Sequence, residues 1–155
     1  EYAWDATGNR IAMWDIIGLA PLQTSTETRY AYDARGRLLS LANGADPAVT
    51  YEYDAVGNVI SERQGALVTT REYDRRNRLR SIETRRASAL VQRTAYAHDA
   101  VGRRIAMTMT GDDGIVRETV YGYDAAGRLI EEIERVAGSV VEQSRYAYDR
   151  VGNRT

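Results

Sequence analysis

The sequence of 155 residues contains no cysteine and no phenylalanine, all of its basic residues are arginine, and histidine occurs once. Without cysteine, neither disulfides nor cysteine-ligated metals can contribute to the structure. The 21 basic and 22 acidic residues leave a formal charge of −1, so no overall field draws the chain to nucleic acid or anionic lipid. No apolar run approaches the ~18 residues that cross a bilayer, so we predict no membrane span. By length alone, the chain would form one domain.

What the sequence does contain is a repeat. Seven aspartates open copies of Asp-x-x-Gly followed by Arg or Asn, separated by 20 residues (Asp54 to Asp74) up to 28 residues (Asp5 to Asp33). The motif aspartates are Asp5, Asp33, Asp54, Asp74, Asp99, Asp124 and Asp149. Three residues later stand Gly8, Gly36, Gly57, Gly102, Gly127 and Gly152, with Asn77 in the fourth copy. Such self-similarity predicts a repeat architecture.

Aromatic residues occupy fixed positions before each motif aspartate. The residue immediately before it is aromatic in six copies and His98 in the fifth, and six copies carry another tyrosine two residues earlier. These aromatic rows are Tyr2, Trp4, Tyr30, Tyr32, Tyr51, Tyr53, Tyr73, Tyr96, Tyr121, Tyr123, Tyr146 and Tyr148. All eleven tyrosines fall inside the motif, so tyrosine here marks a repeat position and is not general core filler.

The motif predicts a β-hairpin. Tyr-x-Tyr places two rings on one face of a strand, and an aspartate carboxylate accepts backbone N–H groups at the start of a turn. The glycine suits the positive φ that closes a three-residue loop with a bulge. Asn77 fits the same position, because asparagine is the commonest other residue to tolerate that conformation. We therefore assign the motif aspartates and glycines to structural turns.

This turn type also fixes which residues face each other across the two strands. The expected pairs are Tyr53–Val59, Tyr32–Leu38, Tyr73–Leu79, Tyr123–Leu129, Trp4–Arg10, His98–Arg104 and Tyr148–Arg154. Aromatic–aliphatic pairs contribute roughly 0.2–1 kcal/mol each, and aromatic–arginine pairs offer stacking instead. A second, variable set of turns is expected at Asn43-Gly44, Gln64-Gly65, residues 111–114 and Ala137-Gly138.

We predict an all-β fold: an antiparallel meander of repeated β-hairpins that forms one curved or spiralling sheet, a section of a β-shell. Seven motifs imply about thirteen strands, and open twisted sheets rarely exceed ~10 strands without curling. No helical segment is available to cover the aromatic face. The repeat array is expected to occupy residues 1–155. Because the chain starts without methionine and stops just past a motif glycine, we expect a piece of a longer protein.

Catalytic and metal-binding interpretations of the motif fit the sequence poorly. Seven copies of one aspartate do not resemble an active site, which is a unique constellation of residues. Known calcium loops need alternating oxygen ligands with a closing glutamate, or a nine-residue period, and neither is present. His98 occupies a tyrosine position, with no nucleophile motif nearby. We predict no catalytic residue, no cofactor and no metal site. Rows of tyrosine and arginine also bind sugars, so carbohydrate binding stays open beside packing.

The strings "YAYDARGRL" (30–38), "YEYDAVGNV" (51–59), "YGYDAAGRL" (121–129) and "YAYDRVGNR" (146–154) resemble the YD-repeat, or Rhs, family. The resemblance covers essentially the whole chain and implies a long β-sheet that spirals into a hollow shell. Bacterial Rhs proteins and the shell components of insecticidal Tc toxins enclose a toxic C-terminal domain in this way, and teneurins use a related shell in adhesion. The family's self-cleaving core has an Asp-Pro-x-Gly signature. Asp46-Pro47 is followed by Ala48 and Val49, so we assign no protease residues.

The resemblance implies a structural wall segment that encapsulates a polypeptide toxin, in a secreted or cell-surface bacterial protein, with no enzymatic activity of its own. The expected partners are the remaining repeats and the C-terminal toxin cargo of the parent polypeptide, and no nucleic acid is expected. The alternative is an extracellular carbohydrate-binding or cell-adhesion module that uses the tyrosine and arginine rows.

Overall fold

The computed structural model describes residues 1–18 and 24–155, and these residues form strands joined by turns, without a helix. Consecutive strands are antiparallel hydrogen-bonded neighbours in sequence order, from β1 to β13. The predicted all-β antiparallel meander is therefore confirmed. The chain divides into two compact units, Glu1–Thr70 and Arg71–Thr155, which are described separately below.

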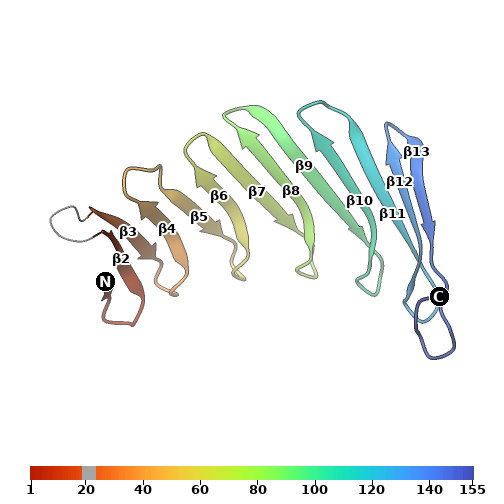
Figure 1. Ribbon diagram of the computed structural model, residues 1–155, viewed down its shortest axis with the longest axis horizontal. Coiled ribbons are helices and arrows are strands. Elements are labelled where there is room, and N and C mark those ends of the chain that lie inside the picture. Colours follow the sequence, from red (N-terminus) through yellow and green to blue (C-terminus); the bar gives the residue numbers. More distant parts are fainter. Residues whose placement is uncertain (19–23) are drawn as a thin grey trace. The chain divides into compact units, whose positions relative to one another are not determined.

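The first unit contains six strands and most of a seventh. They are β1 (Tyr2–Trp4), β2 (Arg10–Ile17), β3 (Thr24–Tyr32), β4 (Leu38–Asn43), β5 (Val49–Tyr53), β6 (Val59–Gln64) and the beginning of β7 (Leu67–Tyr73). Within this unit the Asp-x-x-Gly turns follow β1, β3 and β5 and lie along one edge, which is the lower edge in Figure 1. The β4–β5 and β6–β7 connections lie along the opposite edge.

The second unit repeats this arrangement. It contains the end of β7, followed by β8 (Leu79–Arg86), β9 (Ala89–His98), β10 (Arg104–Gly111), β11 (Val116–Tyr123), β12 (Leu129–Val136) and β13 (Ser139–Arg145). Its Asp-x-x-Gly turns again share one edge, below the strands in Figure 1. The spacing between motif aspartates varies because the strands and the connections between hairpins differ in length, whereas the aspartate turns keep one geometry.

The expected register across the motif turn is confirmed in six hairpins. Tyr53 faces Val59, and the corresponding pairs are Tyr32–Leu38, Tyr123–Leu129, Trp4–Arg10, His98–Arg104 and Tyr148–Arg154. The pairing of Tyr73 with Leu79 stays a prediction. The second residue of the Tyr-x-Tyr pair therefore lies against the first residue of the returning strand, as the three-residue loop requires.

Five of the returning strands carry an additional bulge that the motif did not reveal. Glu52 faces Ser61 while Tyr53 faces Val59, so the register passes over Ile60. The corresponding residues in the other hairpins are Ile11, Leu39, Ile105 and Ile130. A bulge of this kind interrupts the ladder and increases the local twist.

The described residues contain almost no hydrophobic core. Ala12 is the one apolar residue among them that is buried, at 7% exposure, and the other buried residues are Thr28, Ser81, Thr94 and Thr119. No large side chain of the described residues is fully buried. The sheet is a single layer, so its stability comes from the backbone ladder and from side chains that contact the next strand, and not from a packed second layer.

The variable turns follow the prediction in part. A turn occurs at all four places, as expected. Ala137-Gly138 lies wholly within its turn, whereas the first residues of the other three segments, Asn43, Gln64 and Gly111, are the last residues of β4, β6 and β10. A further turn joins β8 to β9 at Ala87-Ser88, which the sequence did not signal because it contains neither glycine nor asparagine.

Ala87 provides a test of backbone strain in this turn. Its φ is +53°, a left-handed conformation that costs a residue with a Cβ roughly 1–2 kcal/mol. Ala87→Gly removes that cost but makes the unfolded chain more flexible by roughly 0.5–1 kcal/mol. We expect a net gain in unfolding free energy of about 0.5–1 kcal/mol by urea denaturation. Ser88 has a φ outside the left-handed region, so the matched control Ser88→Gly should lower the unfolding free energy. Equal changes in unfolding free energy for the two variants would show that Ala87 is not strained.

Candidate functional site

The motif aspartate organises the turn through its carboxylate. Asp54 Oδ1 accepts the N–H groups of Val56 (3.0 Å) and Asn58 (2.8 Å). The backbone closes the loop, since Asp54 N–H donates to the Asn58 carbonyl (3.0 Å) and Gly57 N–H donates to the Asp54 carbonyl (3.2 Å). All seven copies have the same two carboxylate bonds, to the second and fourth residues after the aspartate.

The third residue after the aspartate has a left-handed backbone in every copy. Gly57 has φ +102°, and a Cβ added there would meet no atom within 4 Å. Asn77, the exception to glycine, has φ +64°. The position therefore requires a backbone conformation and not a small side chain.

The fourth residue after the aspartate completes the capture of the carboxylate. Where it is asparagine, its side-chain amide donates to the second carboxylate oxygen, as Asn58 does to Asp54 (2.8 Å). Where it is arginine, the Nε donates to that oxygen at 2.7 Å, as in Arg37–Asp33. The same arginine bond occurs in Arg78–Asp74, Arg103–Asp99 and Arg128–Asp124.

These bonds stabilise the ionised carboxylates. The side-chain hydrogen bond from Arg78, followed by its backbone N–H, lowers the pKa of Asp74 to about 2. For Asp5, the hydroxyl of Thr7 and the backbone and amide of Asn9 lower the pKa to about 2. The pKa of Asp54 is also lowered, first by the amide of Asn58.

The arginines at this position also connect each turn to the next one. The guanidinium of Arg37 lies 4.5 Å from the ring centroid of Tyr53, and its Nη1 donates to the Asp54 carbonyl (3.2 Å). We call this double contact the arginine bridge. Arg103 and Arg128 make it to Tyr123–Asp124 and Tyr148–Asp149, with centroid distances of 4.8 and 4.7 Å. Arg78 reaches the Asp99 carbonyl at 2.9 Å, beside His98.

The tyrosine immediately before the aspartate bonds to the preceding hairpin through its hydroxyl. Tyr53 donates to the carbonyl of Leu38 in the preceding hairpin (2.8 Å), and Leu38 directly precedes the bulge residue Leu39. Equivalent bonds are Tyr32 to Arg10 (3.0 Å), Tyr123 to Arg104 (2.7 Å) and Tyr148 to Leu129 (2.8 Å). The hydroxyl thus pairs with a carbonyl at the point where the bulge breaks the regular ladder.

The first tyrosine of the motif stacks with a different set of arginines. Arg104 lies 5.0 Å over Tyr96, and Arg154 lies 3.7 Å over Tyr146. Arg10 lies 4.6 Å over Tyr30. The sequence suggested stacking of these arginines on their directly paired residues. The guanidinium groups instead lie over the neighbouring tyrosine row, because the arginine side chain extends diagonally across the strands.

The described residues contain no cluster of three or more histidines, aspartates or glutamates that could hold a metal ion. They also contain no helix that is long and apolar enough to cross a bilayer. The motif aspartates lie in separate turns, each held by its own hydrogen bonds. Sequence reasoning located the aspartates, glycines and tyrosines but missed the arginine bridge, although Arg or Asn four residues after every aspartate was the visible signal.

The arginine bridge is tested by Arg37→Asn. The new amide is expected to cap Asp33 as Asn58 caps Asp54, while the contacts with Tyr53 and the Asp54 carbonyl are lost. The unfolding free energy should fall by about 1–2 kcal/mol, the sum of one cation–π contact and one hydrogen bond. Arg29→Asn, which removes an ion pair with Glu27 in which the arginine side chain is 74% exposed, is the control and should change little. Equal effects of the two substitutions would contradict the bridge.

The low aspartate pKa values predict loss of stability in acid. A carboxylate whose pKa is depressed by folding stabilises the fold above its ordinary pKa of 3.8, and this contribution is lost as the pH falls toward about 2. Denaturation followed by circular dichroism should therefore show stability that falls steeply between about pH 4 and pH 2. Asp74→Asn should make this dependence shallower; an unchanged slope would show that Asp74 does not contribute.

Comparisons with known proteins agree with this geometry. The teneurin YD-shell family matches residues 3–155. Double-stranded DNA deaminase toxin A of Burkholderia cenocepacia is 34% identical over 114 residues, which cover 73% of this chain and 7% of that protein. The chain thus spans less than a tenth of that relative's length.

Two solved structures are similar in fold. One is the Tc holotoxin pore of Photorhabdus luminescens with a TccC3 variant (TM-score 0.54, 18% identity, 95% of this chain and 9% of that chain). The other is the crystal structure of TcdB2-TccC3-Cdc42 (TM-score 0.55, 17% identity, 96% of this chain and 10% of that chain). The resemblance to YD-repeat proteins is confirmed, and the chain belongs to the teneurin YD-shell family.

Proposed function

We propose that this chain is a structural wall segment of a β-shell that encloses a polypeptide toxin carried by the same parent protein. The observation that carries the proposal is the sequential antiparallel meander, with arginine bridges between three pairs of consecutive turns and almost no core in the described residues. Such a sheet has no closed centre of its own and can be extended by further hairpins. Membership of the YD-shell family and the name of the deaminase toxin relative support a toxin as the enclosed cargo.

The proposed mechanism is steric. Strands that are hydrogen-bonded to both neighbours leave no gap through which a protease or solvent-borne macromolecule could pass. The Asp-x-x-Gly turns set the hairpin geometry and the aromatic rows couple adjacent hairpins. Family membership supports a structural role for this segment, so we place any enzymatic activity in the cargo. We also propose that the parent protein is secreted or displayed at the cell surface, as a toxin component must be to reach its target.

The alternative of a carbohydrate-binding or adhesion module gains less support from the geometry. Sugar stacking requires an accessible aromatic face, but the ring of Tyr53 is faced by the Arg37 guanidinium at 4.5 Å. Tyr2 and Trp4 are about 60% exposed, with ring centroids 6.5 Å apart, yet their planes are tilted by 43° and do not form one flat platform.

Protease protection of the cargo in the parent protein tests encapsulation. Val120 lies in β11, which is paired on both sides, so Val120→Pro should break the ladder and expose the cargo. Ala125→Pro lies at the first loop position after Asp124, where proline is tolerated, and should leave the cargo protected. Limited proteolysis with detection of the cargo distinguishes them. Cargo that is digested equally in the unsubstituted protein and in Val120→Pro would refute the wall function.

A further inference from the structure

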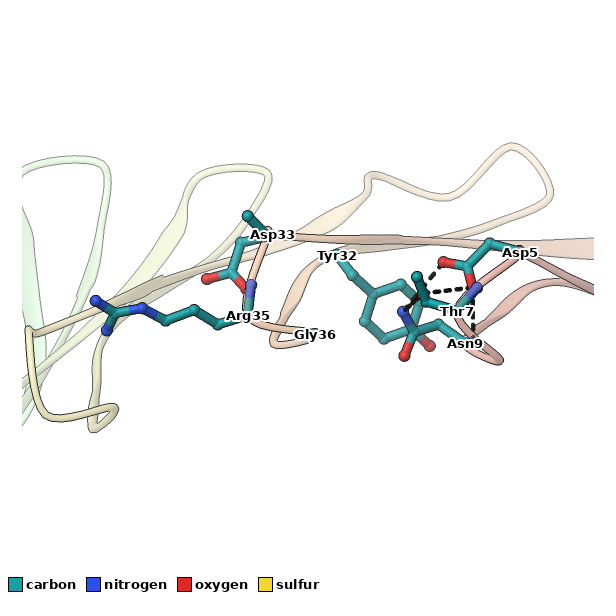
Figure 2. A pocket seen from close by; sticks show the side chains of 8 residues that line it. Asp5, Thr7, Asn9, Tyr32, Asp33, Arg35 and Gly36 are labelled. Carbon is teal, nitrogen blue, oxygen red and sulfur yellow. Dashed lines mark hydrogen bonds between the residues drawn. The ribbon is translucent and has the colours of Figure 1, made fainter.

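A polar notch lies between the first two Asp-x-x-Gly turns of the first unit. It has a volume of about 430 Å³ and is lined by residues that include Asp5, Thr7, Asn9, Tyr32, Asp33 and Gly36. Figure 2 shows Asp5, Thr7 and Asn9 clustered on one side of the notch beside the ring of Tyr32, with Asp33 and Gly36 of the second turn on the other.

The notch occupies the place where an arginine bridge lies at other turns. Arg37 fills the equivalent space before Tyr53 and Asp54, and Arg128 fills it before Tyr148 and Asp149. In the first turn the corresponding residue is Asn9, whose side-chain amide donates to Asp5 and Thr7 of its own turn and to no atom of the second turn. Its Oδ1 lies 3.8 Å from the position of a Cβ on Gly36, a distance similar to those of the Arg78 Nη1 from Gly102 (3.9 Å) and the Arg103 Nη1 from Gly127 (3.5 Å).

A second arginine, which is present at two of the other turns, is also missing from the first turn. Two residues after the aspartate, Arg35 donates to the carbonyl of Ala55 in the next turn (3.2 Å), and Arg76 reaches the carbonyl of Ala100 in the same way. The first turn has Thr7 at this position, and its hydroxyl is directed back to the Asp5 carboxylate (2.8 Å). Thus both side chains that could cross to the second turn are short and are held by Asp5.

The remaining groups suit a planar cation. Tyr32 presents the ring that its counterpart Tyr53 offers to Arg37. The Asp33 carbonyl accepts the Gly36 N–H (2.9 Å). The equivalent Asp54 carbonyl accepts both the Gly57 N–H and the Arg37 Nη1, so the Asp33 carbonyl can accept a second donor in the same way. The neighbouring cations have other partners: Arg37 is paired with Asp33, and Arg35, which also lines the notch, donates to the Ala55 carbonyl and extends away from Tyr32 in Figure 2.

We propose that this notch binds the guanidinium group of an arginine side chain from another polypeptide segment, which would stack on Tyr32 and donate to the Asp33 carbonyl. Within the chain, the same contact is made by arginines from an adjacent turn, so a turn or extended segment of a partner protein can present the group similarly. Guanidinium is favoured over ammonium because it stacks on the ring and donates in its own plane at the same time. The inference rests on the geometry of the first two turns and is independent of the proposed wall function.

The ligand test is a titration of the 155-residue chain followed by NMR. The probe is N-acetyl-L-arginine amide, which presents guanidinium as a peptide does, with a dissociation constant expected on the order of 1–10 mM for a single side chain. Resonances of Asn9, Tyr32 and Gly36 should shift and saturate, and N-acetyl-L-lysine amide should bind at least roughly fivefold more weakly. No saturable shift, or equal binding of the lysine compound, would overturn the proposal.

Filling the notch from within is the second test. Asn9→Arg should build an arginine bridge to Tyr32 and Asp33, raise the thermal midpoint above that of the matched Asn9→Gln variant, and reduce arginine binding at least roughly tenfold. Thr7→Arg, which places an arginine at the position that Arg35 has in the second turn, fills the notch from the other side and should likewise abolish binding. Undiminished binding in both arginine variants would show that the ligand lies elsewhere and would refute the site.

Discussion

The capture of the motif aspartate carboxylate by the chain that follows it is the interaction on which the rest of the structure depends. In each turn the carboxylate binds two backbone N–H groups and a side chain four residues later. This fixes the loop, and the loop sets the pairing of the tyrosine with the returning strand. Because the same side chain can be arginine, the turn that is closed at one aspartate can also be linked to the next turn. The arginine four residues after the aspartate thus both closes its own turn and holds the next hairpin against it.

This arrangement favours tyrosine over phenylalanine and arginine over lysine at the motif positions. Phenylalanine could pack like tyrosine, but it could not donate to the carbonyl that the bulge removes from the ladder, as Tyr53 does to Leu38. Lysine could neutralise an aspartate, but a single ammonium could not bind Asp33, stack on Tyr53 and donate to the Asp54 carbonyl together, as Arg37 does. The fold needs polar aromatic and planar cationic side chains because it has almost no buried core to stabilise it among the described residues.

The alternation of Arg and Asn after the motif glycine therefore has two physical consequences. Both residues cap the aspartate, but only arginine reaches the following turn. At Asn9 the result is a notch that retains the ring and the carbonyl of a bridge. A repeat array can in this way place an arginine-binding position at a chosen turn by substitutions two and four residues after the aspartate, without a change in backbone geometry.

The hairpins, their register and the all-β class could be predicted from the amino-acid sequence, because they depend on a short motif whose chemistry is local: an aspartate, a left-handed glycine and two tyrosines on one strand face. The turn at Ala87-Ser88 could not be predicted, because it contains neither glycine nor asparagine. The bulges could not be predicted either, because residues such as Ile60 are ordinary strand residues. The position of the Arg37 guanidinium over Tyr53, and the bond from the Tyr53 hydroxyl to Leu38, became known from the folded arrangement of the strands. These contacts join residues of different hairpins, and their existence depends on the distance between adjacent turns, which no single copy of the motif specifies.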